Sequence, residues 1–375
     1  MLLTTAQRNA IHYVENYAQS LMQKAQSEVN HILAMSDVSP QALQASLSNI
    51  AAHARVCAHF HPDRLTTTAD NQTVNVVQSL LQSGRYVSQF ESRISNGKLD
   101  PSAKGERADW ENHLFGDHFT QASLPERPKY GALNIAQHAD GPCPRFGSCF
   151  FVFAPDVTQR STFSFGDSHL APPIRGTINH FLPLLAAMLN ESFERETCLG
   201  LSDIRPKSII NDVLTTLGKC ETEVQNAGNL DHYIEAQIHG DLRLADDVTH
   251  LVADSSYRGT PIERDLQTLC ERYDIVLQWR QGYQLTLSEV PTDFRGPSMP
   301  EIAKQIAEFT QQPTLNAHAL GQYVNHRYQA VGTASAMDIA AALQPYKLLW
   351  HVLVRYGSMY PLCTIPHGFV FDLQP

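Results

Sequence analysis

The sequence contains few cysteines, and they are not arranged in pairs. Seven cysteines are spread over 375 residues, at positions 57, 143, 149, 198, 220, 270 and 363, and none of them forms a Cys-x-x-Cys pair. The odd number and the wide spacing exclude a regular disulfide framework and argue against a zinc site made of thiolates. We therefore expect reduced and mostly buried thiols.

The sequence also lacks a long apolar run. No stretch approaches the ~18 apolar residues that a membrane-spanning helix needs. The N-terminal "MLLTTAQRNAIHYVENY" becomes polar after three residues, unlike a signal peptide. We expect a chain that is made in the cytoplasm and does not enter a membrane, and export through a signal-independent secretion machine is compatible with this pattern.

An excess of positive charge is missing as well. The formal net charge is -10, which argues against a broad nucleic-acid-binding surface but not against a local basic groove. Hydrophobic residues make up 43% of the chain and charged residues 18%, as in globular proteins with a sizeable core. No internal repeat and no low-complexity segment is present. At this length we expect one large domain with additions, or two domains.

Periodicity divides the chain into three segments. Residues 1–54 and 291–375 have apolar positions at helical spacing, and 55–290 contains short β-rich runs. The runs are "RVCAHF", "YGALNIA", "SCFFVFA", "RSTFSF", "YIEAQIH", "HLVAD" and "DIVLQW". Helices are expected among them at about 73–83, 176–193, 207–218 and 261–273. Because regular βαβ alternation is missing, this order predicts an α+β domain over 55–290 with helical N- and C-terminal additions.

Three details predict where helices begin or are interrupted. Ser39 and Pro40 are an N-cap and first-turn pair that begins a second helix. Ser298 is the expected N-cap of a helix in the C-terminal segment. Pro345 lies inside the apolar "AMDIAAALQPYKLLWHVLVRY" and is expected to kink or break that helix.

The stretch "HFHPDR" at residues 59–64 permits three interpretations. The first is the His-Pro-Asp tripeptide of the co-chaperone J domain, which lies in a loop between two long antiparallel helices. Here the preceding "VCAHF" is β-branched and aromatic, and the helix before it carries little positive charge. A strand is therefore expected before the tripeptide, and we reject the J-domain interpretation.

The second interpretation is a metal site that contains His59 and His61. On a strand both side chains project from one face, as a His-x-His pair must to share one ion. The best candidates for further ligands are His239 and Asp241 of "IHGD". With 17 histidines chance pairs are common, and no other cluster has metal-like spacing. We expect no bound metal, and a hydrogen-bonded core histidine is the structural alternative.

The third interpretation rests on several stretches together. These are "HFHPDRL", "VNVVQSLLQSGRY", "RPKYGALN", "FGSCFFVFAPDVTQRSTFSFGDS" and "YIEAQIHGDLRLADDVTHLV". Over roughly residues 50–285 the set resembles a family of uncharacterised bacterial proteins with a domain of unknown function. The order of its parts looks like the ADP-ribosyltransferase fold: a first strand with Arg or His, a middle strand with Ser and Thr, and a later strand with the essential Glu. The resemblance implies a body with a split sheet.

Glu235 is the candidate for that essential carboxylate. On a strand, Tyr233, Glu235 and Gln237 share one face, while the apolar residues between them face the core. A charge in the middle of an apolar alternating strand requires a reason, and a solvated polar strand face is the alternative. Transferases of this type often have two glutamates, or Gln then Glu, one residue apart. Here the order is Glu then Gln, which leaves the acceptor molecule open.

The resemblance implies an NAD-dependent mono-ADP-ribosyltransferase, toxin- or effector-like, that cleaves the nicotinamide–ribose bond of NAD without a metal. Either His61 or Arg64 would grip the ribose or the pyrophosphate. Tyr130 would stack on nicotinamide, and Ser161 and Thr162 would brace the catalytic carboxylate. The acceptor would be a protein side chain, a nucleic-acid base or water.

Other assignments remain possible for parts of this pattern. Asp167 and Ser168, in the turn after "RSTFSF", are expected to cap a helix. A metal-dependent hydrolase of phosphate esters or nucleotides, which would use the His59 and His61 pair, is the alternative function. A non-enzymatic interaction protein is a second alternative, in which the same residues serve packing.

Overall fold

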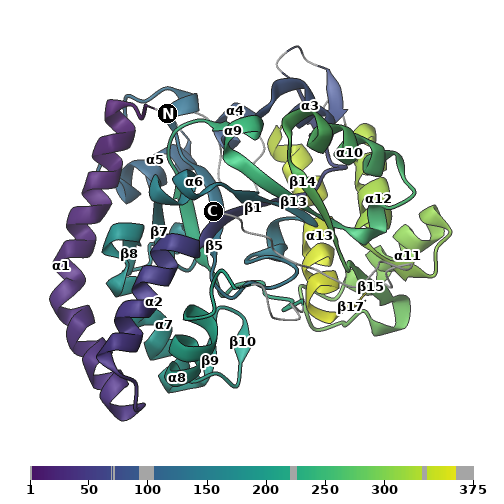
Figure 1. Cartoon of the computed structure of the whole chain (residues 1–375). Coiled ribbons are helices and arrows are strands. Elements are labelled where there is room, and N and C mark those ends of the chain that lie inside the picture. Colours follow the sequence, from purple (N-terminus) through teal and green to yellow (C-terminus); the bar gives the residue numbers. More distant parts are fainter. Residues whose placement is uncertain are drawn as a thin grey trace.

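A computed structural model describes residues 2–68, 70, 72–92, 105–219, 226–331 and 336–359, and the fold is given for these residues (Figure 1). Its centre is one eight-stranded sheet, and the chain is α+β as expected. The strands follow one another across the sheet as β14 (Val276–Arg280), β13 (Val248–Asp254), β6 (Cys149–Phe153), β1 (Arg55–Phe60), β5 (Lys129–Asn134), β11 (Ile234–Ile238), β7 (Ser161–Phe165) and β8 (Arg175–Thr177).

The sheet is continuous. Neighbouring strands are antiparallel except for β13 and β14, which are parallel. The two halves of the sheet meet at β1, which pairs with β5 over Arg55–Cys57 and with β6 over Cys57–Phe60. Within the described residues, His59 and Phe60 pair with β6 but not with β5, so the halves are joined over only part of β1, which is compatible with the expected split.

The two faces of the sheet differ in chemistry. Val56 of β1 and Ile234 of β11 belong to the main apolar core, which they share with Leu184 and Met188 of α7 (Leu182–Arg195). Because successive side chains of a strand point to opposite faces, the neighbours of Val56 in β1 and of Ile234 in β11 lie on the opposite face of the sheet. That opposite face carries Glu235 and the other polar side chains of the central strands.

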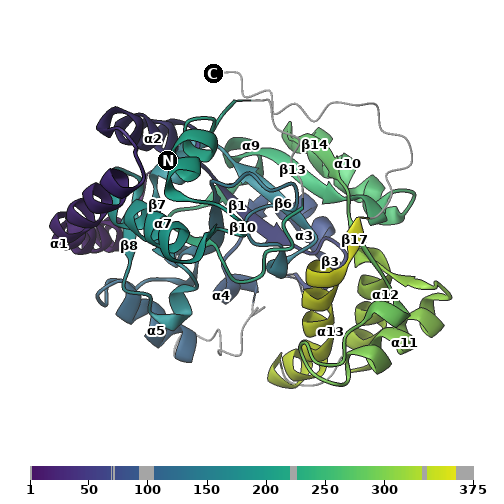
Figure 2. The same ribbon diagram turned by 90° about the horizontal axis from the view of Figure 1, so that it is seen from below.

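Helices surround the sheet. The longer ones are α1 (Thr5–Met35), α2 (Pro40–His53), α3 (Val76–Ser83), α5 (Glu106–Leu114), α7, α10 (Pro261–Tyr273), α11 (Met299–Thr310), α12 (Ala317–Ala330) and α13 (Ala336–Tyr356). Short ones are α4 (Gln89–Ser92), α6 (Pro155–Gln159), α8 (Pro206–Ser208) and α9 (Leu244–Asp247). α1 packs along α7 and β8, on the opposite side of the molecule from α11, α12 and α13 (Figures 1 and 2).

Small strands connect the additions to the body. β15 (Tyr283–Thr286) pairs with β16 (Thr314–Leu315) and with β17 (Ser358–Met359), so it is held to two segments on either side of α12 and α13. The other pairs are β2 (Leu65–Thr67) with β3 (Thr73–Asn75), β4 (Arg85–Tyr86) with β12 (Leu242–Arg243), and β9 (Thr197–Cys198) with β10 (Leu201–Ser202).

The predicted helix ends have mixed outcomes. Ser39 caps α2, since its side chain accepts a hydrogen bond from the backbone N–H of Ala42 at 3.2 Å. Ser298 occupies the N-cap position of α11, but its side chain makes no capping bond. Of the expected kink or break at Pro345, the break is wrong, because α13 continues through this residue as one helix. Packing of its apolar side against the body outweighs the missing backbone donor.

Two broader expectations concern membranes and thiols. Within the described part of the chain, we find no helix with both the length and the apolar character to cross a bilayer. The described cysteines are unpaired and buried, as predicted: Cys57, Cys143, Cys149, Cys198 and Cys270. Cys220 and Cys363 lie outside the described residues.

Candidate active site

A row of polar side chains crosses the face of the sheet opposite the main core. β7 and β11 are neighbours, so that Ser164 lies opposite Glu235 and Thr162 opposite Gln237. On the other side of β11, Tyr130 of β5 also lies opposite Gln237. Because residues paired across strands project from the same face, five polar side chains gather on three strands.

Hydrogen bonds fix the carboxylate of Glu235 within this row. Ser168 donates its hydroxyl to Glu235 Oε1, and the side-chain amide of Gln237 donates to the same oxygen at 3.0 Å. The Thr162 hydroxyl donates to Gln237 Oε1 at 2.9 Å, which sets the orientation of the amide. The amide also donates to Ser164 Oγ at 3.1 Å. Each polar partner of Glu235 is thus held by a further contact.

The protonation of Glu235 is set by its burial. The side chain is 7% exposed, so the alternative of a solvated strand face is wrong. The pKa of Glu235 is raised to about 7 by burial and by the nearby charge of Asp167, against the hydrogen bonds from Ser168 and Gln237, which lower it. Near neutral pH, Glu235 is therefore present in both the protonated and the ionised form.

A second carboxylate anchors Tyr130. Glu111 of α5 is fully buried; its Oε1 accepts a hydrogen bond from the Tyr130 hydroxyl at 2.7 Å. Its Oε2 forms an ion pair of 3.1 Å with Arg127. Arg107 lies over the ring of Tyr130, 5.3 Å from the ring centroid, and over Trp110 at 5.2 Å. The Tyr130 ring is thus held by its hydroxyl, by a cation and by its stacking on Trp110.

Trp110 also connects α5 with the turn that carries Ser168. Its indole N–H donates to the backbone oxygen of Ser168 at 3.0 Å. Asp167 caps this turn, η3 (Ser168–Leu170), by accepting from the backbone N–H of His169 at 3.0 Å, as expected from the sequence. The capped turn and the indole together position the Ser168 hydroxyl on Glu235.

Ser161 does not belong to the row. Its hydroxyl donates to the backbone oxygen of Val157 at 2.7 Å, and it shares a face of β7 with the core residue Phe163. The prediction that Ser161 braces the carboxylate is wrong, because the alternation of the strand turns Thr162 and Ser164 toward β11's polar side chains instead.

The "HFHPDR" turn follows β1 and lies beside α12 and α13. Nδ1 of His61 is 3.2 Å from Ser148 Oγ, and the ring meets that of Trp350 edge-on, with 4.9 Å between the centroids. Arg64 is half-buried, and burial lowers the pKa of its guanidinium, although the charges of Asp63 and Tyr257 act in the opposite direction. Neither His61 nor Arg64 makes a described contact with Glu235.

Side chains of α13 lie near both this turn and the residues beside Glu235. The indole N–H of Trp350 donates to the backbone oxygen of Pro144 at 2.9 Å. Lys347, one turn earlier in α13, lies close enough to Asp167 for that charge to affect its pKa. His351 is similarly close to His61. Lys347 and His351 of α13 therefore lie near the two groups of residues predicted for the site, Lys347 near Asp167 and His351 near His61.

A family model described as "Protein of unknown function (DUF3626)" matches residues 55–356. This span includes the whole eight-stranded sheet and all of α13. The chain belongs to the DUF3626 family. No curated protein matches the chain. The match begins at residue 55, where the predicted α+β domain begins, and it extends beyond residue 290 into the helices that contribute Lys347 and Trp350.

Within the DUF3626 region, the four proposed metal ligands are not gathered. His59 is a core residue: Nδ1 is 3.1 Å from the backbone oxygen of Gly147, and Nε2 accepts from the backbone N–H of Cys143. Burial lowers its pKa to about 3. The ring of His239 packs against the aromatic rings of Phe115 and Phe119. Asp241 pairs with Arg85 at 3.0 Å.

Across the described ranges, no three His, Cys, Asp or Glu side chains stand together in an arrangement that could hold a metal ion. The His59, His61, His239 and Asp241 set therefore does not support the hydrolase alternative.

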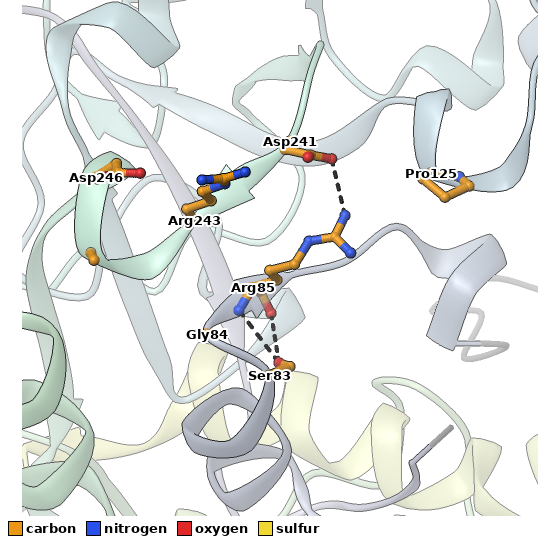
Figure 3. A pocket seen from close by; sticks show the side chains of 8 residues that line it. Ser83, Gly84, Arg85, Pro125, Asp241, Arg243 and Asp246 are labelled. Carbon is orange, nitrogen blue, oxygen red and sulfur yellow. Dashed lines mark hydrogen bonds and ion pairs between the residues drawn. The ribbon is translucent and has the colours of Figure 1, made fainter. Parts of the chain in front are cut away.

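A surface pocket of about 540 Å³ lies elsewhere on the DUF3626 region (Figure 3). Its lining residues are Ser83, Gly84, Arg85, Pro125, Asp241, Arg243, Ala245 and Asp246. The ion pair between Arg85 and Asp241 crosses it, as Figure 3 shows. None of these residues belongs to the Glu235 row, so the pocket is a separate feature.

Several residues of the site were not predicted from the sequence. Ser168 was assigned a capping role alone, and Glu111 and Lys347 were not singled out as site residues. "WENHLFG", which contains Trp110 and Glu111, combines aromatic and acidic residues, and this is a weak signal for a site. Lys347 lies in an apolar helix and gives no such signal.

Proposed function

We propose that the protein is an NAD-dependent mono-ADP-ribosyltransferase, toxin- or effector-like, in which Glu235 is the catalytic carboxylate. The observation that carries the proposal is the buried Glu235 carboxylate, held by Ser168 and Gln237 beside the Ser and Thr side chains of β7. The likeness to the ADP-ribosyltransferase fold is part of this proposal, and the partial pairing of β1 with β5 is compatible with a split sheet.

The reaction breaks the bond between ribose C1′ and the nicotinamide nitrogen. The bonding electron pair leaves with nicotinamide, and positive charge develops on the ribose. The acceptor then forms a bond to C1′ and loses a proton. A carboxylate near the ribose hydroxyls stabilises such an oxocarbenium-like state, as in glycoside cleavage. Glu235 supplies that carboxylate in its ionised form.

The raised pKa of Glu235 is compatible with this role. In the free protein the carboxyl is partly protonated near pH 7. The nicotinamide ring of NAD carries a positive charge, and an opposite charge nearby favours the ionised form of a carboxyl. Binding of NAD beside Glu235 would therefore lower its pKa and convert it to the form that the reaction needs.

Other residues of the row have supporting roles in the proposal. Gln237 orients Glu235 and is the second candidate catalytic residue, while Thr162 fixes the Gln237 amide. Tyr130 offers a ring for stacking on nicotinamide, and its hydroxyl bond to Glu111 keeps that ring in place. His61 or Arg64 would hold the part of NAD distant from nicotinamide.

The acceptor is a protein side chain, a nucleic-acid base or water. The experiment that tests the function is the release of nicotinamide from NAD by the purified protein, with and without cell lysate as a source of acceptors. Glu235→Gln is the test variant. Glu308→Gln is the matched control, because Glu308 is an exposed glutamate of α11 that pairs with Lys304.

A further inference from the structure

Basic side chains converge where α13 meets the turn η2 (Pro144–Phe146). Asp231 forms ion pairs with Arg145 at 2.6 Å and with Arg295 at 3.7 Å, so both arginines lie around one carboxylate. The hydrogen bond from Trp350 to the backbone of Pro144 holds α13 against the same turn. Lys347 precedes Trp350 on this helix by about one turn and lies among the same cations.

Acidic partners are too few for these cations. Both arginines share Asp231, and within the described residues Lys347 has no ion pair. Asp167 is an acid whose charge raises the pKa of Lys347. The whole chain has a formal net charge of -10, so a local excess of positive charge is not a consequence of composition. Its electrostatic field would attract an anion to this place.

Several buried donors of the cluster have no acceptor. Nε of Arg145 and Nε of Arg295 make no hydrogen bond within the described part of the chain. His351, which is 2% exposed, lies beside the backbone of Arg145 in the same cluster. A buried donor without an acceptor costs free energy. A ligand with several acceptor oxygens would remove that cost.

The titration of Lys347 agrees with this arrangement. Burial lowers the pKa of Lys347 to about 8, and the charges of Arg145, Arg107 and Arg295 lower it too, while Asp167 raises it. Burial and the same basic neighbours lower the pKa of His351 to about 3, so the imidazole is neutral at pH 7. In the free protein, Lys347 and the neighbouring arginines therefore repel one another.

We propose that Arg145, Arg295 and Lys347 form a binding site for a diphosphate group. Two arginines that share one carboxylate, with a lysine near them, match an anion that has several oxygens and more than one negative charge, and guanidinium groups can contact such an anion in a bidentate manner. Phe146 and Phe294 fix the guanidinium planes, since Arg145 and Arg295 each lie 5.0 Å from the centroid of the neighbouring ring.

The assignment of this diphosphate to a dinucleotide rests on the proposed function. Lys347 lies near Asp167, and Asp167 directly precedes the Ser168 that holds Glu235. A dinucleotide with its nicotinamide ribose at Glu235 would place its diphosphate toward α13. The anion site itself depends only on the basic cluster, so it can be tested without any enzymatic activity.

Calorimetric titration with inorganic pyrophosphate at low salt tests the site. Lys347→Gln and Arg295→Gln are expected to weaken binding about tenfold or more, because each removes a charge-assisted hydrogen bond to the anion. Lys207→Gln and Arg205→Gln are matched controls, since both residues are exposed and pair with acids elsewhere. Equal affinity of the test and control variants, or no pyrophosphate binding by the wild type, would overturn the proposal.

Proton uptake gives a second readout that a folding defect would not imitate. A bound anion raises the pKa of Lys347 from about 8, so binding at pH 8.5 should take up a proton in the wild type and not in Lys347→Gln. Titrations in buffers of different ionisation enthalpy measure this uptake. If Lys347→Gln takes up as many protons as the wild type when pyrophosphate binds, Lys347 is not part of the binding site and the proposal is contradicted.

ADP-ribose distinguishes the two sources of the diphosphate group. Tighter binding of ADP-ribose than of pyrophosphate, weakened by Lys347→Gln, supports a nucleotide ligand. Pyrophosphate binding that Lys347→Gln weakens, without tighter binding of ADP-ribose, supports a site for free diphosphate. Nicotinamide release is measured separately, so its absence would contradict the proposed function and leave the anion site standing.

Discussion

Ser168 donates its hydroxyl to the carboxylate of Glu235, although 67 positions separate the two residues in the sequence. The turn after β7 brings them together, and Trp110 holds that turn through the backbone oxygen of Ser168. A hydrogen bond to the ionised form of a carboxyl lowers its pKa. Ser168 therefore favours the form of Glu235 that the proposed reaction uses.

Removal of this hydroxyl should move the pH dependence of the reaction. In Ser168→Ala the pKa of Glu235 rises above its present value of about 7, because the bond that lowers it is lost. The acidic limb of kcat/KM for nicotinamide release should then shift to higher pH by about one unit. Ser202→Ala, on exposed β10, is the control and should leave the limb unchanged. An unshifted limb in Ser168→Ala contradicts the role of Ser168.

Glu235 should also make stability depend on pH. Its pKa is raised from 4.5 to about 7 in the folded state, so the stability that it contributes is present below pH 4.5 and is lost as the pH rises through 7. Glu235→Gln removes this loss. Relative to the wild type, the variant should gain up to about 3 kcal/mol between pH 4 and pH 8.

Urea unfolding of both proteins at the two pH values measures the difference. A relative stability of Glu235→Gln that is the same at pH 4 and pH 8 would show that the Glu235 carboxyl is not desolvated in the folded protein.

Gly321 of α12 should not tolerate alanine. A Cβ at this position would overlap the carboxylate of Asp63, both of whose oxygens are buried. Gly→Ala inside a helix ordinarily stabilises by about 1 kcal/mol. Here we expect destabilisation of about 1–3 kcal/mol, as for other overpacked sites. Urea unfolding of Gly321→Ala measures the effect.

Asp63→Ala supplies the control for this substitution. With the carboxylate removed, Gly321→Ala should lose its cost or become stabilising, because the two changes act on one contact. If Gly321→Ala destabilises the wild type and Asp63→Ala by the same amount, the added methyl group does not clash with the Asp63 carboxylate.

Arg64→Ala should weaken the binding of NAD more than it slows the reaction. Arg64 lies in the turn after β1, away from Glu235, so its loss should raise KM for NAD several-fold and leave kcat within about twofold. Steady-state kinetics of nicotinamide release separate the two constants. Arg205→Ala, at an exposed ion pair, is the matched control. A large fall in kcat with KM unchanged would contradict a gripping role.

The sequence predicted local features well where one short pattern determined them. β1 coincides with "RVCAHF" and α10 with the expected helix at 261–273, because alternation and helical spacing are strong in both. The same alternation placed Glu235 and Gln237 on the polar face of β11. The same alternation places Ser161 and Thr162 on opposite faces of β7, so they cannot both brace Glu235, as the resemblance to a Ser-Thr strand implied.

Long-range partners could not be predicted in this way. Glu111 contacts Tyr130 from a helix with little amphipathic character, and Lys347 lies near Asp167 on a helix whose sequence gives no signal of a site. The short strands β3 and β8 precede α3 and α7 in segments that had been assigned entirely to helix, because pairing with a distant strand overrides local propensity.

Nicotinamide release from NAD by the wild type and by Glu235→Gln, with NAD binding measured in parallel, tests the central claim most directly. We predict release by the wild type and a fall of about a hundredfold or more in Glu235→Gln, with little change in NAD binding, because the substitution removes a charge and keeps the shape. Glu308→Gln should behave as the wild type. No release by the wild type in the presence of lysate, or full activity of Glu235→Gln, would contradict the account.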